Sequence, residues 1–299
     1  MSWWVIASLL AAFAQALRFM LQKSINLDGI TATGATFARF VYSAPLMISL
    51  LALWVFSSGK ALPDASWAFY LYAMGGGVTQ IMGTICIVLL FSQRHFAVGT
   101  TFMKTEVILT VLVGFTLLGD AIPTLAFAAI CLGVVGLVVL SLRPDQPFSL
   151  REIGNRSALL GLLSGLLFAF SAVSYRGASL ELEAAPLLRA ACTLAFVTGF
   201  QMCIMAVWLR LQAPGEITAV MRVWQRGVPL GLLSLAGSFG WFFAFTLQNA
   251  AYVKAVGQVE LIFSLLIGAL VFGERVTPRE LLGMALLGAS IAALLLAAA

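Results

Sequence analysis

The sequence predicts an all-α membrane protein whose ten transmembrane helices form two inverted five-helix repeats. The first observation is composition: the chain of 299 residues is 62% hydrophobic and only 10% charged, whereas soluble globular domains carry about 25% charged residues. The second is segment length, because the apolar runs recur at the roughly 20 residues that a membrane-spanning helix needs. A chain this apolar cannot cover its own surface in water, so lipid must be its solvent over much of its length.

Charges, prolines and glycines divide the apolar sequence into ten predicted spans. The first five are Trp3–Gln22, Ala32–Phe56, Ser66–Phe91, Ala97–Leu118 and Ile122–Leu142. After the hydrophilic stretch Pro144–Arg156, the second five are Ser157–Tyr175, Ala185–Leu209, Gly227–Asn249, Ala251–Phe272 and Pro278–Ala298. No polar stretch is long enough for an extramembrane domain. The predicted domains are therefore two five-helix repeats, residues 1–143 and 156–299.

Prolines and glycines add local expectations within these spans. Pro186 and Pro278 stand where the first turn of a helix tolerates proline. Pro45 lies inside the second span and predicts a kink there. The glycine-rich segments Gly75–Gly77 and Gly161–Gly165 permit close approach between helices, and we interpret them as packing positions.

The distribution of charge and cysteine argues against several classes of protein. The net charge is +5, but lysines and arginines occur singly between apolar runs, with none of the basic stripes that bind nucleic acid. The four cysteines lie inside apolar runs without metal-ligand spacing, and we interpret them as small core residues: Cys86, Cys131, Cys192 and Cys203. We expect no nucleic-acid partner, no metal and no cofactor. We also expect no cleavable signal peptide, because Met1 and Ser2 lead directly into the first span.

An internal repeat is the most specific feature of the sequence. One ungapped register pairs Glu106 with Glu260, 154 residues further on. The same register pairs Gly114 with Gly268, Gly119 with Gly273 and Asp120 with Glu274, and a one-residue shift then pairs Gly133 with Gly288. Five spans per half is an odd number, so equivalent helices run in opposite directions. The pattern predicts an inverted-topology repeat, which places a solute site near the midplane between the halves.

This repeat resembles the drug/metabolite transporter superfamily, in particular its ten-helix EamA-type members. The resemblance rests on the Glu-x7-Gly-x4-Gly-[Asp/Glu] block late in each half, at Glu106–Asp120 and Glu260–Glu274. The proline that commonly follows the glutamate in this family is replaced by Val107 and Leu261. The resemblance implies a carrier of small metabolites, and relatives include exporters of amino acids and carriers of nucleotide sugars and sugar phosphates.

Charges inside the spans are the best candidates for a solute site, because a charge at the bilayer centre costs roughly 2.5–3.5 kcal/mol on insertion scales. Glu106 and Glu260 are the glutamates well inside predicted spans. The aspartates lie in predicted loops: Asp28, Asp64, Asp120 and Asp145. The basic residues at least about a turn inside are Lys104, Lys254, Arg39 and Arg189. Two hypotheses stay open for the glutamates: a polar centre for solute or protons, and a structural Arg–Glu pair in each half. For the arginines we favour structure or snorkelling.

Helix geometry divides these polar residues between faces. Lys104 and Glu106 are two positions apart, about 200° around a helix, and Gln258 and Glu260 repeat this relation. One face of each helix should therefore line the cavity, and the sequence does not say which. The predicted substrate-binding residues are Glu106, Glu260, Lys104, Gln258, Gln80, Trp241, Tyr252 and Gln15. We interpret the single histidine, His95, as a solvated turn residue.

The favoured function is secondary transport of small metabolites across the cytoplasmic (inner) membrane, such as export of amino acids or similar amphipathic compounds. The chain has no Walker A motif, so we expect the solute gradient or coupled protons to drive alternating access. The alternatives are an intramembrane enzyme, which the lack of clustered His, Asp and Cys disfavours, and a non-transporting membrane subunit. The expected partners are a small-molecule substrate and the lipid bilayer, with the protein a monomer or a homodimer.

The orientation of the chain follows from its loop charges. Ten spans place both termini on one side of the membrane, where the loops carry little beyond Lys60 and Arg176. The opposite loops carry Lys23, Arg94, Arg143, Arg151, Arg156, Arg210, Arg222, Arg226, Arg275 and Arg279. The positive-inside rule predicts termini outside the cytoplasm, whereas the family resemblance implies cytoplasmic termini.

A reporter fused after Ala299 tests the orientation that the charges favour. We expect a fusion partner that folds only in the periplasm to be active there, because the basic loops remain on the cytoplasmic side. Activity of a reporter that works only in the cytoplasm would contradict this orientation and leave the predicted fold intact.

Overall fold

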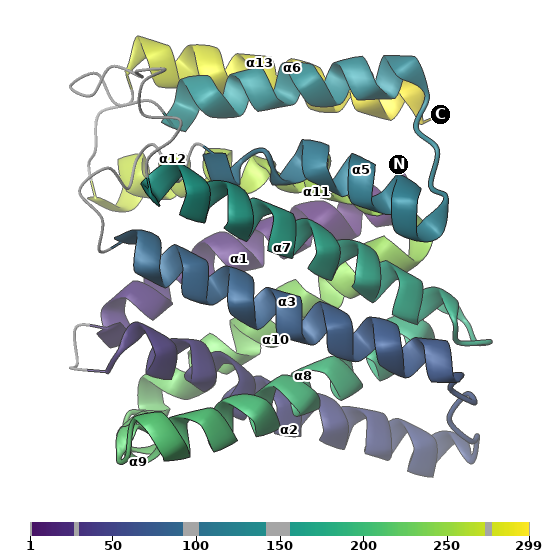
Figure 1. Cartoon of the computed structure of the whole chain (residues 1–299), viewed down its shortest axis with the longest axis vertical. Coiled ribbons are helices and arrows are strands. Elements are labelled where there is room, and N and C mark those ends of the chain that lie inside the picture. The colour runs from purple at the N-terminus through teal and green to yellow at the C-terminus, as the bar shows by residue number, and fades with distance from the viewer. Residues whose placement is uncertain (1, 27–29, 92–101, 142–155, 273–276, 299) are drawn as a thin grey trace. The chain divides into compact units, whose positions relative to one another are not determined.

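The computed structural model describes residues 2–26, 30–91, 102–141, 156–272 and 277–298. Every regular element in these residues is a helix (Figure 1). The helices of the first half are α1 (Trp3–Asn26), α2 (Ala32–Ser58), α3 (Trp67–Phe91), α5 (Glu106–Leu118) and α6 (Thr124–Ser141). Those of the second half are α7 (Arg156–Leu180), α8 (Pro186–Gln212), α9 (Glu216–Arg222), α10 (Trp224–Leu247), α11 (Ala250–Gly257), α12 (Val259–Phe272) and α13 (Pro278–Ala297).

The length and composition of these helices fit a multi-pass membrane protein. Five helical segments in the described residues are long and apolar enough to cross a membrane: Thr33–Ser58, Arg156–Leu180, Pro186–Gln212, Trp224–Leu247 and Pro278–Ala297. Three shorter apolar segments accompany them: Trp3–Arg18, Glu106–Leu118 and Thr124–Leu140. The all-helical membrane class is thus supported, whereas the count of ten spans stays a prediction.

Helix ends follow the local chemistry expected from the sequence. Pro186 and Pro278 both lie in the first turn of their helices, as predicted. Thr277 precedes Pro278 and forms a capping box with Glu280, in which each side chain accepts a backbone N–H of the other. Pro45 lies inside α2, and the kink that it predicts stays a prediction.

Two predicted spans are interrupted in the structure, which corrects the sequence analysis. The predicted fourth span should run unbroken to Leu118, but α5 begins only at Glu106, after a turn at Lys104 and Thr105. The predicted ninth span is divided into α11 and α12 at Gln258. Because Lys104 and Gln258 lie in turns, the 200° argument that put them opposite the glutamates on a helix is wrong.

The chain forms two compact units, and each takes segments from both halves of the sequence. The first unit contains Met1–Val78 and Ser174–Leu247, and the second contains Thr79–Val173 and Gln248–Ala299. These units differ from the predicted repeats 1–143 and 156–299. A repeat is defined by equivalent sequence and not by compactness, so the two divisions can coexist.

Small residues bring the helices of the first unit together. Gly240 of α10 lies against α1, where a Cβ on it would come 2.9 Å from the Cβ of Ala11. A Cβ added to Gly231 of the same helix would lie 2.4 Å from the Cβ of Tyr42 on α2. In the predicted packing segment Gly75–Gly77, a Cβ on Gly76 would lie 2.7 Å from the Tyr175 ring. Such distances leave no room for a side chain, so glycine is required for these approaches.

In the second unit, α6 and α13 form an extensive helix pair, and the two lie side by side in Figure 1. A Cβ on Gly136 would lie 3.0 Å from the backbone nitrogen of Leu287. A Cβ on Gly283 would lie 2.6 Å from the Leu140 side chain. Ser290 Oγ also donates to the carbonyl of Ala129 at 2.6 Å. Backbone proximity and an interhelical hydrogen bond therefore hold this pair together.

The glycine contacts of this helix pair can be tested by adding one methyl group. Gly136→Ala and Gly283→Ala should each lower the melting temperature of the purified protein, because overpacking costs about 1–3 kcal/mol. Gly288→Ala on the same helix is the matched control, since nothing lies within 4 Å of its added Cβ. It should leave the melting temperature unchanged or raise it, as alanine favours helix. Equal melting temperatures for all three variants would contradict the packing.

Candidate functional site

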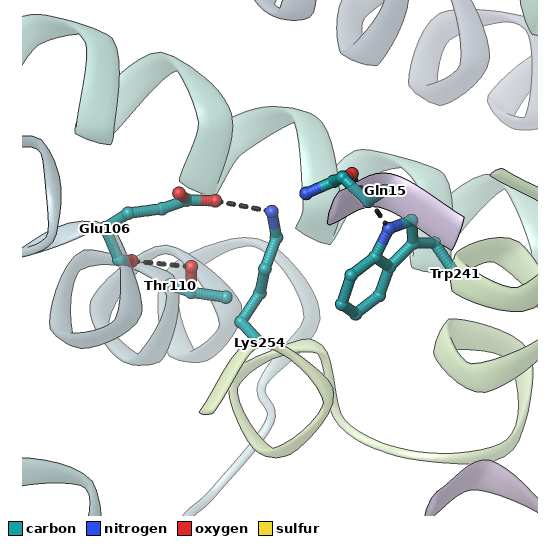
Figure 2. A network of polar contacts seen from close by, with 5 residues as sticks. All are labelled: Gln15, Glu106, Thr110, Trp241 and Lys254. Carbon is teal, nitrogen blue, oxygen red and sulfur yellow. Dashed lines mark hydrogen bonds and ion pairs between the residues drawn. The ribbon is translucent and has the colours of Figure 1, made fainter. Parts of the chain in front are cut away.

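An ion pair inside the second unit joins the two halves of the sequence. Lys254 Nζ lies 2.5 Å from Glu106 Oε1 (Figure 2). The two side chains are 23% and 13% exposed, so both are largely removed from solvent. At this depth an isolated charge costs several kcal/mol, and removing one partner of such a pair is strongly destabilising. Each charge therefore depends on the other for its stability, and the pair forms a polar site inside a mainly apolar unit.

The ends of two broken helices stabilise this ion pair. Glu106 lies in the first turn of α5, where the helix dipole favours a negative charge. Lys254 lies in the last turn of α11, where the dipole favours a positive charge. Thr110 Oγ1 donates to the Glu106 carbonyl at 2.7 Å and adds a bond within the first turn of α5 (Figure 2). The helix breaks thus create the electrostatic environment that makes these two buried charges tolerable.

The two breaks have the same local geometry. The Thr105 N–H donates to the Phe102 carbonyl at 3.1 Å, three residues back, and the Gln258 N–H donates to the Ala255 carbonyl at 3.3 Å. In both places one turn tightens before the helix restarts, and a glutamate lies in the first turn after it: Glu106 in α5 and Glu260 in α12. The sequence equivalence of the two glutamates thus extends to their backbone setting.

The eight predicted site residues are divided between the two units. Glu106, Glu260, Lys104, Gln258, Gln80 and Tyr252 belong to the second unit, and Gln15 and Trp241 belong to the first. Tyr252 is buried in α11, with 6% of its surface exposed. The Gln80 carbonyl, on α3, accepts a hydrogen bond from Thr84 Oγ1. In the first unit, Trp241 Nε1 donates to Gln15 Oε1 at 3.1 Å (Figure 2).

The basic residues have different partners from those that the sequence suggested. The structural alternative for the glutamates was an Arg–Glu pair in each half, but the partner of Glu106 is Lys254. Arg39 Nη2 donates to Ser238 Oγ at 3.3 Å. Arg189 Nε donates to the Ala184 carbonyl at 2.7 Å. The sequence places Lys254 inside a span but does not assign it to the site, because a partner 148 residues away leaves no local pattern.

A buried aromatic and amide cluster lies in the first unit. The rings of Tyr175 and Phe242 stack with centroids 4.6 Å apart. Gln201 is 1% exposed, and its Nε2 donates to the Gly77 carbonyl at 3.2 Å and to the Tyr175 hydroxyl at 3.4 Å. The sequence does not predict Gln201 as part of a site, because a lone glutamine in an apolar run carries no positional signal.

The first unit also contains an apolar groove of about 890 Å³. Its walls come from α2, α8, α10 and the segments that precede α3 and α8. Two charged residues, Lys60 and Glu183, line it among otherwise apolar side chains such as Trp54. None of the eight predicted site residues lines this groove.

Several sequence predictions fall on residues that the structure does not describe. They concern His95, Asp28, Asp145 and the repeat partner Glu274. Within the described ranges, no group of three or more His, Cys, Asp or Glu side chains could hold a metal ion.

Comparison with known proteins identifies a family for the second half of the chain. Residues 155–296 match the model of the EamA-like transporter family, which confirms the resemblance that the repeat indicates. A solved structure, described only as "Crystal structure of protein", is similar to this chain with a TM-score of 0.75 and 15% sequence identity. The match covers 100% of this chain and 99% of the chain in that structure. At that identity the likeness shows the fold alone. No curated protein sequence matches this chain. The family indicates a membrane transporter of the drug/metabolite type.

The ion pair predicts non-additive effects on stability. Glu106→Gln and Lys254→Gln should each lower the melting temperature, because each removes the opposite charge from its partner. The full penalty for breaking a buried pair is about 3–5 kcal/mol, and partial exposure makes it smaller here. The double variant should lose less than the sum of the single losses. Lys104→Gln removes a nearby positive charge without touching the pair and serves as the control. Strictly additive losses would contradict the coupling.

Proposed function

We propose that this chain, whose residues 155–296 belong to the EamA-like transporter family, is a secondary transporter of small metabolites in the cytoplasmic membrane. The solutes are amino acids or similar amphipathic compounds, moved outward by alternating access. The observation that carries the proposal is the Glu106–Lys254 ion pair at two helix breaks. Helices broken inside the membrane, with charges at their ends, are the usual setting of solute and coupling-ion sites in secondary transporters.

Contacts within the units support the inverted repeat on which alternating access depends. In the 154-residue register, Gly83 corresponds to Gly237 and Ala14 corresponds to Phe168. A Cβ on Gly237 would lie 3.5 Å from the Ala14 side chain, and one on Gly83 would lie 3.3 Å from the Phe168 side chain. The contact between α1 and α10 thus has an equivalent between α7 and α3. A two-fold relation between halves requires such paired contacts.

Helix pairing gives a second kind of support for the repeat. Two of the packed pairs join helices at equivalent positions in the two halves: α2 with α8, and α6 with α13. A helix packs against its own equivalent only where it lies next to a two-fold axis. We therefore propose ten spans in two five-helix halves, related by a pseudo-two-fold axis in the membrane plane.

The chemistry of the proposed site centres on carboxylates that can exchange partners. Glu106 is held by an ammonium group, so the ammonium of an amino-acid solute or a proton can take the place of Lys254. Glu260 occupies the equivalent helix start in the second half. A solute gradient or coupled protons can supply the driving force in this scheme.

A binding screen followed by flux measurement tests the proposal. The purified protein is heated with each member of a panel of amino acids and other small metabolites, since a ligand that binds the folded state raises its apparent stability. Compounds that raise the melting temperature are then followed in proteoliposomes. A panel that yields neither a stabilising compound nor flux would refute transport of this solute class.

The glutamates can be separated from their structural role in the same assay. Glu260→Gln keeps shape and removes charge, so it should abolish flux or its pH dependence. The double variant Glu106→Gln/Lys254→Gln removes the carboxylate without leaving its partner charge behind, and it should also fail to transport. Arg210→Gln, which removes an exposed charge from the last turn of α8, is the flux control. Full flux with unchanged pH dependence in both Glu variants would remove the carboxylates from the mechanism.

A further inference from the structure

Arg39 is a cation in the first unit that lacks an anionic partner. It lies seven residues after the start of α2, about 10 Å along the helix axis, and its side chain is half-buried. Its guanidinium makes a hydrogen bond to Ser238 and lies 5.2 Å from the centroid of the Phe40 ring. Among the residues that the structure describes, no carboxylate lies within ion-pair distance of it. A guanidinium has five donors, and one neutral hydroxyl leaves most of them for another group.

A polar group on the neighbouring helix α10 lacks a hydrogen-bond partner. Ser234 is 3% exposed, and its hydroxyl makes no hydrogen bond in the described structure. It lies one turn before Ser238 on α10, and both serines are on the same face of this helix as Gly227 and Gly231. Those glycines lie against Tyr42 of α2, so this face of α10 is directed toward α2. The two serines and Arg39 are therefore on the facing surfaces of one helix pair.

Two other arginines of the first unit differ from Arg39 in their partners. Arg189 lies near the start of α8, and its Nε is satisfied by the Ala184 carbonyl at 2.7 Å. Arg176 donates to the Phe245 carbonyl at 2.9 Å. Backbone carbonyls thus fix both of these arginines in structural positions. Among the described residues Arg39 has no such bond to a carbonyl. A half-buried cation without an anion and a buried hydroxyl without a hydrogen bond are both unfavourable.

We propose that Arg39, Ser234 and Ser238 form a carboxylate-binding subsite between α2 and α10. A guanidinium fork matches the two oxygens of a carboxylate, and the serine hydroxyls add donors to them. Phe242, one turn beyond Ser238, stacks on Tyr175 and supplies an aromatic wall next to the charge. The ligand class is a small carboxylate with an apolar or aromatic body. The inference rests on the proposed function in one respect, because it takes this ligand to be the transported solute.

Two probes of the same shape and different charge test the subsite at equilibrium. 3-Phenylpropionate and its neutral amide are titrated into the purified protein, and the melting temperature is followed. The acid should stabilise the wild type and the amide should not. In Arg39→Gln the acid should bind roughly 10- to 100-fold more weakly, the loss expected for a charge-assisted hydrogen bond. Arg189→Gln is the matched control and should bind the acid as the wild type does.

A milder variant guards against loss of folding in Arg39→Gln. Ser234→Ala/Ser238→Ala removes two hydroxyls from positions where alanine fits, and it should weaken binding of the acid by a smaller factor, about 3- to 10-fold. Equal binding of acid and amide by the wild type, no binding of either, or wild-type affinity in both variants would each overturn the subsite. Acid binding that depends on Arg39 in a protein without flux would instead refute transport and leave the subsite standing.

Discussion

The interior of a bilayer offers no hydrogen-bond partners, and this constraint governs the rest of the structure. Backbone groups must be satisfied within helices, so an interruption costs several kcal/mol unless other protein groups cover it. The described helices break inside predicted spans at Lys104–Thr105 and at Gln258. Both breaks are closed by a bond to a carbonyl three residues back. The exposed helix dipoles then make these ends the most favourable places for Glu106 and Lys254.

Close packing follows from the same constraint. Lipid tails are as apolar as leucine, so helices in a bilayer gain little by burying apolar surface and depend on close contact instead. The described interfaces are built accordingly: Gly231 and Gly240 of α10 fit against α2 and α1, and Gly136 and Gly283 bring α6 and α13 to backbone distance. These closely packed helix pairs hold the polar groups in place within each unit.

The sequence predicted the features that repeat and missed those that depend on three-dimensional pairing. Composition and span length gave the membrane class, and the 154-residue register gave the equivalence of Glu106 and Glu260, which the matching helix starts support. The helix breaks were missed because neither segment contains proline, the one strong local signal for a break. The partnership with Lys254 was missed because side chains on separate helices meet through packing that no spacing reveals. The unsatisfied donors of Arg39 were invisible for the same reason.

The sequence around the two glutamates departs from the repeat at its basic residues, and under the proposed alternating access this asymmetry has an energetic consequence. In the 154-residue register Lys254 corresponds to Thr100, and Lys104 corresponds to Gln258. In an inverted repeat, the two access states exchange the environments of the halves. The contact equivalent to Glu106–Lys254 would then join Glu260 with a threonine, which cannot form an ion pair. The pair would stabilise one access state over the other, so a solute or proton that competes with Lys254 for Glu106 would shift the equilibrium toward the opposite state.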